Sequence, residues 1–179
     1  MVSEARVRPG IFHIAAIALI GLLFFDAGPA RAQVTPFMQA VAETAAPDAD
    51  IAAFYKANGY KPIWTGRGNK DKNRRSALLK ALKNAGDHAL PVSSYNIELL
   101  RANLRKVKSQ RELGKIEVAL SQTFLKYARD LQTGILTPRK IDSGIVRAVP
   151  LRNRTELLAA FVKSNPTAFL RKLPPKSPE

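Results

Sequence analysis

The sequence predicts a mainly α-helical protein with a single domain, and three observations support that prediction. The longest apolar stripe recurs at steps of three and four residues, which is the spacing of one face of an α-helix. Glycine and proline follow the segments that show this spacing, as they follow helices. Alternation of apolar and polar residues, the pattern of paired strands, is confined to short stretches near Ile63 and Val146. The stripe consists of Ile116, Leu120, Phe124, Tyr127 and Leu131.

The N-terminus has the three parts of a secretory signal peptide. Arg6 and Arg8 make its start positive, residues 11–25 are almost entirely apolar, and Ala30 and Ala32 form the small-x-small pattern of a cleavage site. The apolar run is short for a membrane-spanning helix, which needs about 20 residues. We therefore predict a signal peptide over residues 1–32 and export of the protein, with an uncleaved membrane anchor as the alternative.

Caps and helix-breaking residues predict the elements in chain order. Asp48 or Asp50 is suited to cap the first helix, and Asn96 is suited to cap the third. Pro62 disfavours a helical conformation at the residue before it. Gly134 and then Pro138 end the longest helix. The predicted order is a linker over 33–47, a helix ended by Asn58-Gly59, an extended segment over 60–66, a polar loop over 67–73, a helix over about 74–84, a loop over 87–95, a helix to about 107, and a long helix over about 111–133.

Two shorter helices complete the predicted domain. Asn153 or Thr155 begins the first of them, and Asn165-Pro166 opens the second, with the proline at the first helical position. The prolines of the tail over residues 175–179 prevent any further helix. We therefore assign one helical domain to residues 48–174, with residues 111–133 as its central helix.

The chain is strongly basic. It carries 29 Lys and Arg residues against 14 Asp and Glu residues, a formal net charge of +15, which indicates an anionic partner. Because export separates the protein from nucleic acid, we expect the partner to be the carboxylate-bearing cell-wall polymer or an anionic membrane surface. A solvated surface that only keeps the domain soluble is the alternative. The residues predicted to contact an anion are Arg101, Arg105, Lys106, Lys108, Arg111 and Lys115, with Lys70, Lys72, Arg74 and Arg75 as a possible extension of the same face.

Few residues in the sequence have the chemistry of catalysis. The chain has no cysteine, so it has neither a thiol nucleophile nor a thiolate metal ligand. His88 lies beside Asp87, but a general base needs a nucleophile or a positioned water, and a role in stabilising the loop is the favoured interpretation. The sequence has no metal-ligand spacing and no phosphate-binding glycine loop. We predict no catalytic residue, no cofactor and no metal.

Tyr127 and Asp130 are three residues apart and therefore neighbours on the surface of the long helix. One interpretation places them as a polar pair at the mouth of a groove. The favoured one places the tyrosine ring in the core stripe, with Asp130 bonded to a nearby loop or arginine. Trp64, the only tryptophan, is predicted to fill the core, with a sugar-stacking platform as the alternative.

Three segments together resemble a known family: "IAAFYKANGYKPIW", "LLKALKNAGDHALPVSSY" and "VALSQTFLKYARDLQTGILTPRKID". They are similar to the N-terminal scaffold region of the large, YcbB-type murein L,D-transpeptidases of Gram-negative bacteria, and the likeness covers about residues 51–178. Asp130 and the late stretch "NPTAFLRKLPPKSP" belong to the same resemblance. The other residues that carry it are Phe54, Tyr55, Tyr60, Pro62, Trp64, Ala85, Gly86, His88, Leu90, Pro91, Tyr95, Glu117, Leu120, Tyr127, Ala128, Leu131, Gly134 and Pro138.

The resemblance implies a place in peptidoglycan remodelling in the periplasm. Enzymes of that family use a cysteine thiolate, with a histidine partner, to cross-link two diaminopimelate residues. Their His-Gly and Ser-His-Gly-Cys motifs are both missing from this sequence, which ends at Glu179. We therefore expect a non-catalytic periplasmic scaffold domain of an L,D-transpeptidase-like protein, as a truncated product or a free-standing remnant. Two alternatives are an adaptor that binds peptidoglycan or a wall enzyme through its basic face, and the N-terminal part of a split or longer active enzyme.

Overall fold

The computed structural model describes residues 33–135 and 151–174, and the protein is mainly α-helical there, as the sequence predicts. These residues form seven α-helices and two short 3-10 helices, and they contain no strand. The predicted signal peptide over 1–32, the predictions at Pro138 and Val146, and the tail over 175–179 lie outside the described residues.

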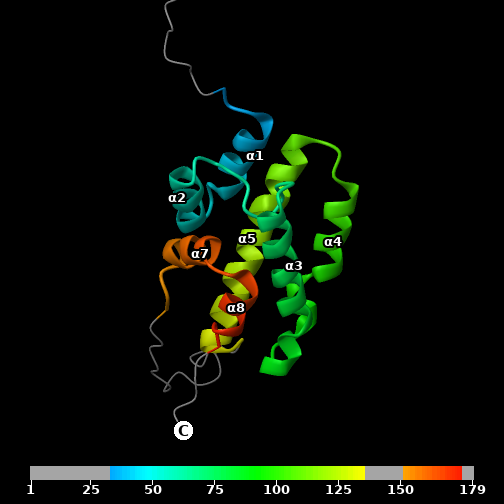
Figure 1. Cartoon of the computed structure of the whole chain (residues 1–179), viewed down its shortest axis with the longest axis vertical. Helices are drawn as coiled ribbons and strands as arrows, with labels where there is room; N and C mark the ends of the chain where they lie inside the picture. The colour runs from blue at the N-terminus through cyan, green and yellow to red at the C-terminus, as the bar shows by residue number, and fades with distance from the viewer. Residues whose placement is uncertain (1–32, 136–150, 175–179) are drawn as a thin grey trace, which may run out of the picture. The chain divides into compact units, whose positions relative to one another are not determined.

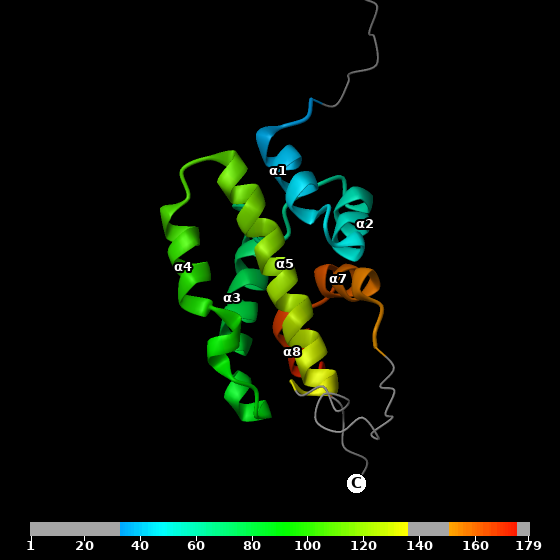
Figure 2. The same ribbon diagram turned by 180° about the vertical axis from the view of Figure 1, so that it is seen from behind.

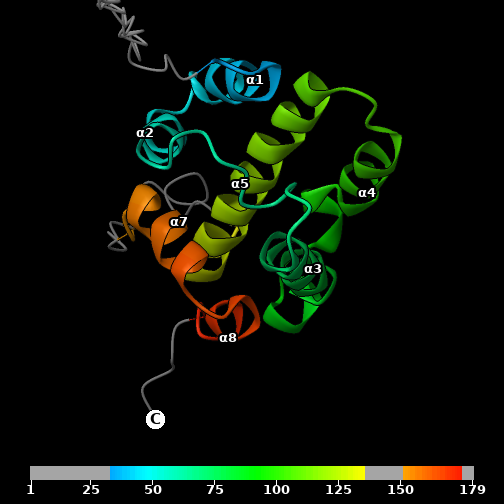
Figure 3. The same cartoon turned by 45° about the horizontal axis from the view of Figure 1, so that its top comes forward.

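The long helix α5, Gln110–Thr133, is central, as predicted. Helices α3 and α4 lie on one side of it, and α1, α2 and α7 lie on the other (Figures 1 and 2). Figure 3 shows the same division from another direction, with α8 next to α3. The other helices are α1 Pro36–Ala45, α2 Ala49–Ala57, α3 Asn69–Lys83, α4 Ile97–Lys106, α7 Arg154–Lys163 and α8 Pro166–Arg171, with 3-10 helices η1 Ala85–His88 and η2 Val92–Tyr95.

Local signals at both ends explain the length of α5. Ser109 and Glu112 form a capping box, in which each side chain accepts a hydrogen bond from the other residue's backbone N–H. At the other end Gly134 has a φ of 69°, a left-handed conformation that a residue without Cβ adopts at little cost, and its N–H donates to the Asp130 carbonyl. Between these ends the whole predicted stripe is buried. The prediction of the long helix is confirmed, with a start one residue earlier.

The end of α2 also follows its sequence signal. The N–H of Tyr60 donates to the Tyr55 carbonyl at 2.8 Å, and the N–H of Gly59 donates to the Lys56 carbonyl at 3.1 Å. This pair of bonds is the Schellman arrangement, which satisfies carbonyls that the last helical turn leaves open. Asp48 caps the other end of α2 by accepting from the N–H of Ile51.

The linker predicted over residues 33–47 is wrong, because most of it is α1. Thr35 caps this helix by accepting from the N–H of Met38, and Pro36 occupies a first-turn position where no N–H is needed. Phe37 and Val41 share the face that is buried against α5. Alanine-rich composition misled the prediction, since alanine is also the strongest helix former.

Gly114 sets how closely α1 approaches α5. A Cβ atom at this position would lie 2.7 Å from the Phe37 carbonyl oxygen and 2.9 Å from the Ala40 Cβ. Neither atom belongs to a flexible side chain, so a larger residue has to push α1 away. The glycine, which weakens a helix when considered alone, is needed here for packing.

Replacing Gly114 with valine is therefore expected to destabilise the domain by about 1–3 kcal/mol, the usual cost of overpacking. Urea unfolding measures the loss, and hydrogen exchange of the α1 amides should rise in the same variant. Gly86→Ala is the control, because a Cβ there meets nothing within 4 Å. Slow α1 exchange in the valine variant would contradict this packing.

Three further boundaries differ from the predictions. Helix α3 begins at Asn69, so much of the polar loop predicted over 67–73 is helical; its lysine and asparagine side chains are exposed, where a helix tolerates them. Asn96 precedes α4 but makes no side-chain cap, because its backbone is left-handed with a φ of 48°. The loop predicted over 87–95 contains η2 and the end of η1.

An aromatic cluster joins the C-terminal helices to α5. The rings of Trp64 and Phe161 stack with centroids 5.1 Å apart, and Phe124 of α5 lies 4.7 Å from Phe161. Phe169 of α8 contacts the Phe161 ring edge-on at 5.5 Å. Three of these four side chains are fully buried, so the cluster forms the centre of the core.

Candidate functional site: buried polar clusters and a basic hollow

The most concentrated polar chemistry of the described residues surrounds Glu117 on α5. Its side chain is fully buried, and its carboxylate accepts hydrogen bonds from three consecutive backbone N–H groups. The N–H of Ile63 lies at 2.6 Å, that of Trp64 at 3.1 Å and that of Thr65 at 2.8 Å. The hydroxyl of Thr65 donates at 2.6 Å and that of Tyr55 at 3.0 Å. Five donors thus converge on one carboxylate.

The chain around Pro62 explains why these N–H groups are available. The segment predicted to be extended over 60–66 instead has a turn at Tyr60 and bends from residue 63 onward. Residues 61–65 form no ladder with a second strand among the described residues, so the carboxylate satisfies the N–H groups of 63–65. On the carbonyl side, Arg74 donates to the Ile63 oxygen at 3.3 Å and Arg75 donates to the Trp64 oxygen at 2.5 Å. We call this arrangement, made of Glu117, Tyr55, Ser121 and the backbone of residues 63–65, the Glu117 latch.

Ser121 completes the latch one helical turn after Glu117. Its Oγ accepts from the indole N–H of Trp64 at 2.8 Å and lies 2.8 Å from the Tyr55 hydroxyl, in hydrogen bond with it. Within the described residues, every fully buried side-chain nitrogen or oxygen has a hydrogen-bond partner. The latch is therefore satisfied internally.

Burial raises the pKa of the Glu117 carboxyl above its ordinary value of 4.5, and the hydrogen bonds from Thr65, Ile63 and Tyr55 offset part of the rise. As pH rises above 4.5, Glu117 loses its proton in the unfolded chain at a lower pH than it does in the folded chain. The stabilisation that comes from protonated Glu117 is therefore fully present below pH 4.5. It is lost as pH rises through the pKa that Glu117 has in the folded protein.

We accordingly expect the stability difference between the parent and Glu117→Gln to shrink as pH rises from 4.5 through the folded pKa. Urea unfolding of both proteins across this pH range measures the difference. Glutamine does not titrate, and the contributions of all other titratable groups are the same in both proteins and cancel. A difference that grows with pH would show that the folded pKa is lowered instead.

A second polar cluster lies farther along α5. Asp130 accepts from the Tyr95 hydroxyl at 2.9 Å and from the Lys126 ammonium at 2.6 Å, and that ammonium sits 4.6 Å from the centre of the Tyr95 ring. Burial and the Asp130 carboxylate raise the pKa of Tyr95. Tyr127 is buried, and its ring meets the Tyr95 ring edge-on. Asp130 thus ties η2 to α5, while Tyr127 packs in the core.

The remaining candidates from the sequence lie apart from these clusters. His88 is exposed at the end of η1, and no side-chain hydrogen bond involves it among the residues that the structure describes. Trp64 is fully buried, so its ring offers no surface to a sugar. Nothing in the described residues brings His88 together with a nucleophile.

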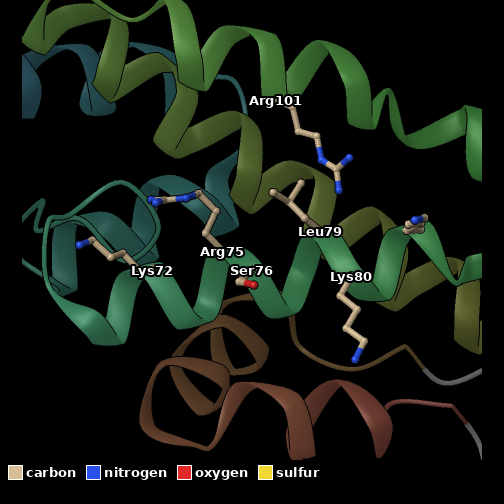
Figure 4. A pocket seen from close by; sticks show the side chains of 7 residues that line it. Lys72, Arg75, Ser76, Leu79, Lys80 and Arg101 are labelled. Carbon is tan, nitrogen blue, oxygen red and sulfur yellow. The ribbon is translucent and has the colours of Figure 1, made fainter.

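A basic hollow of about 360 Å³ opens beside α3 and α4. Ser76 and Leu79 line it together with five cationic side chains, and no acidic residue is among its lining residues. Figure 4 shows Arg101 reaching from α4 toward α3, while the other side chains come from α3 itself. The cationic side chains are Lys72, Arg75, Lys80, Lys83 and Arg101.

The hollow shares only part of its lining with the basic face predicted from the sequence. Arg101, Lys72 and Arg75 line it, but Arg74 is buried and bonded to Asp71 at 2.7 Å. Arg111 pairs with Glu43 across α1 and α5. Four other predicted residues are exposed outside the hollow, and so is Lys70. Those four are Arg105, Lys106, Lys108 and Lys115.

Comparison with known protein families matches residues 49–179 to the family described as Scaffold domain. The chain belongs to the Scaffold domain family. The match begins at the first residue of α2, after α1, and extends through all the later helices. No curated protein and no solved structure matches this scaffold domain.

Glu117 and the hollow are the features of the scaffold domain that residue-level reasoning missed. Glu117 was noticed only within the resemblance, because a charge on a helix is usually solvated. A signal was present, since Glu117, Ser121 and Phe124 follow a spacing of four and three that adds polar residues to the buried face. Lys80 and Lys83 were missed because their contribution depends on how α3 faces α4.

Two negative findings apply to the described part of this scaffold domain. No group of histidine, aspartate and glutamate side chains within residues 33–135 and 151–174 is arranged to hold a metal ion. Across the same residues, no helix has the length and apolar character needed to cross a membrane.

Proposed function

We propose that this scaffold domain is a non-catalytic structural part of an L,D-transpeptidase-like system that remodels peptidoglycan in the bacterial periplasm. The family match over residues 49–179 supports the scaffold part of the proposal. The resemblance to YcbB-type enzymes, with the signal-like N-terminus, supports the periplasmic and peptidoglycan part. In this role the domain holds or positions a cross-linking enzyme and does not itself perform the reaction.

One observation carries the non-catalytic assignment: five polar residues of the resemblance are hydrogen-bonded within two buried clusters. Tyr55, Trp64 and Glu117 meet in the latch, and Tyr95 meets Asp130 in the second cluster. A catalytic group has to reach a substrate atom within hydrogen-bond distance. These side chains are buried and already saturated, which favours a structural role for them.

The composition points in the same direction. Diaminopimelate cross-linking of this class depends on a cysteine thiolate, and the 179 residues contain no cysteine. The thiolate for the proposed system therefore lies outside these 179 residues, and we propose that the peptidoglycan-processing enzyme that this domain supports supplies it. The net charge of +15 suits a setting among the anionic polymers of the cell envelope.

Deleting the gene from its host tests the proposal. We expect a lower share of muropeptides cross-linked between two diaminopimelate residues, measured by mass spectrometry of digested sacculi, and recovery when the gene is returned. The variant Glu117→Gln should fail to restore the share, because the latch is lost, whereas the exposed Glu98→Gln variant should restore it. An unchanged muropeptide profile in the deletion strain would refute the link to this cross-linking.

A further inference from the structure

One face of α3 is basic along most of its length. The residues of α3 that line the hollow are spaced by three, one, three, one and three, so they share a single side of the helix. At 1.5 Å per residue this side runs for about 16 Å. Those residues are Lys72, Arg75, Ser76, Leu79, Lys80 and Lys83.

The hollow gathers five cations with no carboxylate among its lining residues. Some cations outside the hollow do have a carboxylate close by: Arg154 binds Asp48 and Asp50, and Lys126 binds Asp130. Within the described residues, Lys72, Lys80 and Lys83 form no ion pair, and Arg101 has only the exposed Glu98 at 3.3 Å. Cations that gather around one hollow make its electrostatic potential more positive, and a bound anion reduces their mutual repulsion.

The hollow also has fixed parts. The guanidinium of Arg75 is half-buried and is held by its bond to the Trp64 carbonyl, so the Glu117 latch sets its position. Leu79 supplies an apolar patch and Ser76 a hydroxyl on the same side of α3 (Figure 4). A guanidinium held in place loses less freedom on binding a carboxylate than a lysine does.

We propose that the basic hollow binds an extended acidic strand, a flexible chain that carries carboxylates at intervals. The cations follow one another along α3, and Arg101 reaches toward that helix from α4, an arrangement that suits several anionic groups in sequence better than one small ion. Choosing carboxylates as the anions rests on the proposed function, which sets the domain among the carboxylate-bearing peptide stems of the cell wall.

The exposed apolar residues argue against a membrane surface as the occupant. Proteins that lie on membranes insert large apolar side chains beside their basic residues. Within the described residues the exposed large apolar side chains are elsewhere, and none of them lines the hollow. They are Val34, Val92, Leu99, Ile135 and Leu151.

The test is fluorescence anisotropy of a short labelled oligoglutamate peptide with the purified full chain at low ionic strength. The double variant Lys72→Glu with Lys83→Glu should bind at least about tenfold more weakly, and binding to the parent should weaken with added salt. Both lysines are exposed and lie at opposite ends of α3, so the favourable and unfavourable effects of acids at helix ends offset one another.

The matched control is Lys61→Glu with Lys163→Glu, which changes the net charge equally at exposed lysines outside the hollow. Its affinity should stay within about twofold of the parent. Equal losses in both double variants would overturn the site and leave only general attraction by net charge. If circular dichroism shows a melting shift in the first variant, Lys72→Gln with Lys83→Gln replaces it under the same criteria.

Vesicles of phosphatidylglycerol and a polyphosphate of matched charge form the other arms. Tighter binding of either one, lost in Lys72→Glu with Lys83→Glu, would overturn the acidic strand in favour of a phosphate-bearing occupant. The outcome is separable from the proposed function, because the deletion strain is scored by its muropeptides and this experiment by affinity. If the peptide does not bind at the hollow but the deletion strain has an altered muropeptide profile, the acidic-strand proposal is wrong and the scaffold role is retained.

Discussion

Glu117→Gln is expected to lower the free energy of unfolding by about 3–5 kcal/mol near neutral pH, because each buried donor left unsatisfied costs about 1–3 kcal/mol and more than one is affected. The amide keeps the size of the side chain but has only one acceptor oxygen. Its NH₂ group then faces backbone N–H donors of residues 63–65, which are left unsatisfied in a buried place.

Urea unfolding followed by circular dichroism measures this change, and Glu98→Gln is the matched control. Glu98 is exposed and makes one ion pair with Arg101, so its replacement should change the stability by less than about 0.5 kcal/mol. Equal stabilities for the parent and Glu117→Gln would show that the latch does not hold the fold.

The second large effect is expected from Trp64→Ala, which should cost about 3–5 kcal/mol, as truncation of a buried aromatic side chain usually does. The ring is fully buried between Phe161 and Phe124, and its loss leaves a cavity where the segment that carries Trp64 meets α5 and α7. Circular dichroism is the suitable probe, because Trp64 is the only tryptophan and the variant has no indole fluorescence.

Trp64→Phe separates the packing of the ring from its hydrogen bond. Phenylalanine keeps an aromatic ring in the cluster but loses the indole N–H that donates to Ser121. Its cost should therefore be smaller, about 1–2 kcal/mol. If the alanine variant melted like the parent, the central place of Trp64 in the core would be wrong.

The sequence predicts the helices of this protein better than it predicts their polar contacts. The stripe of α5 and its end at Gly134 depend on local spacing and a local turn, which a single segment of sequence contains. The same holds for Asn153 before α7 and for Pro166 at the start of α8. The start of α3 was harder, because a charged run is compatible with either a loop or an exposed helix.

The Glu117 latch needs information that local sequence does not hold. Ile63 and Glu117 are 54 residues apart, and only the packed fold brings the carboxylate to that backbone N–H. α1 was missed for a related reason, since its value as a helix depends on the space that Gly114 leaves on α5. The hollow likewise depends on α4 standing opposite α3, which charge counting along the chain does not reveal.

Amide hydrogen exchange of residues 63–65 is the most direct test of the central claim, which is that Glu117 holds this non-helical segment against α5. These amides lie outside every helix, so without the carboxylate they would exchange rapidly. Measured by NMR, they should exchange as slowly as the core amides of α5, and Glu117→Gln should remove that protection. Rapid exchange of the three amides in the parent protein would contradict the claim.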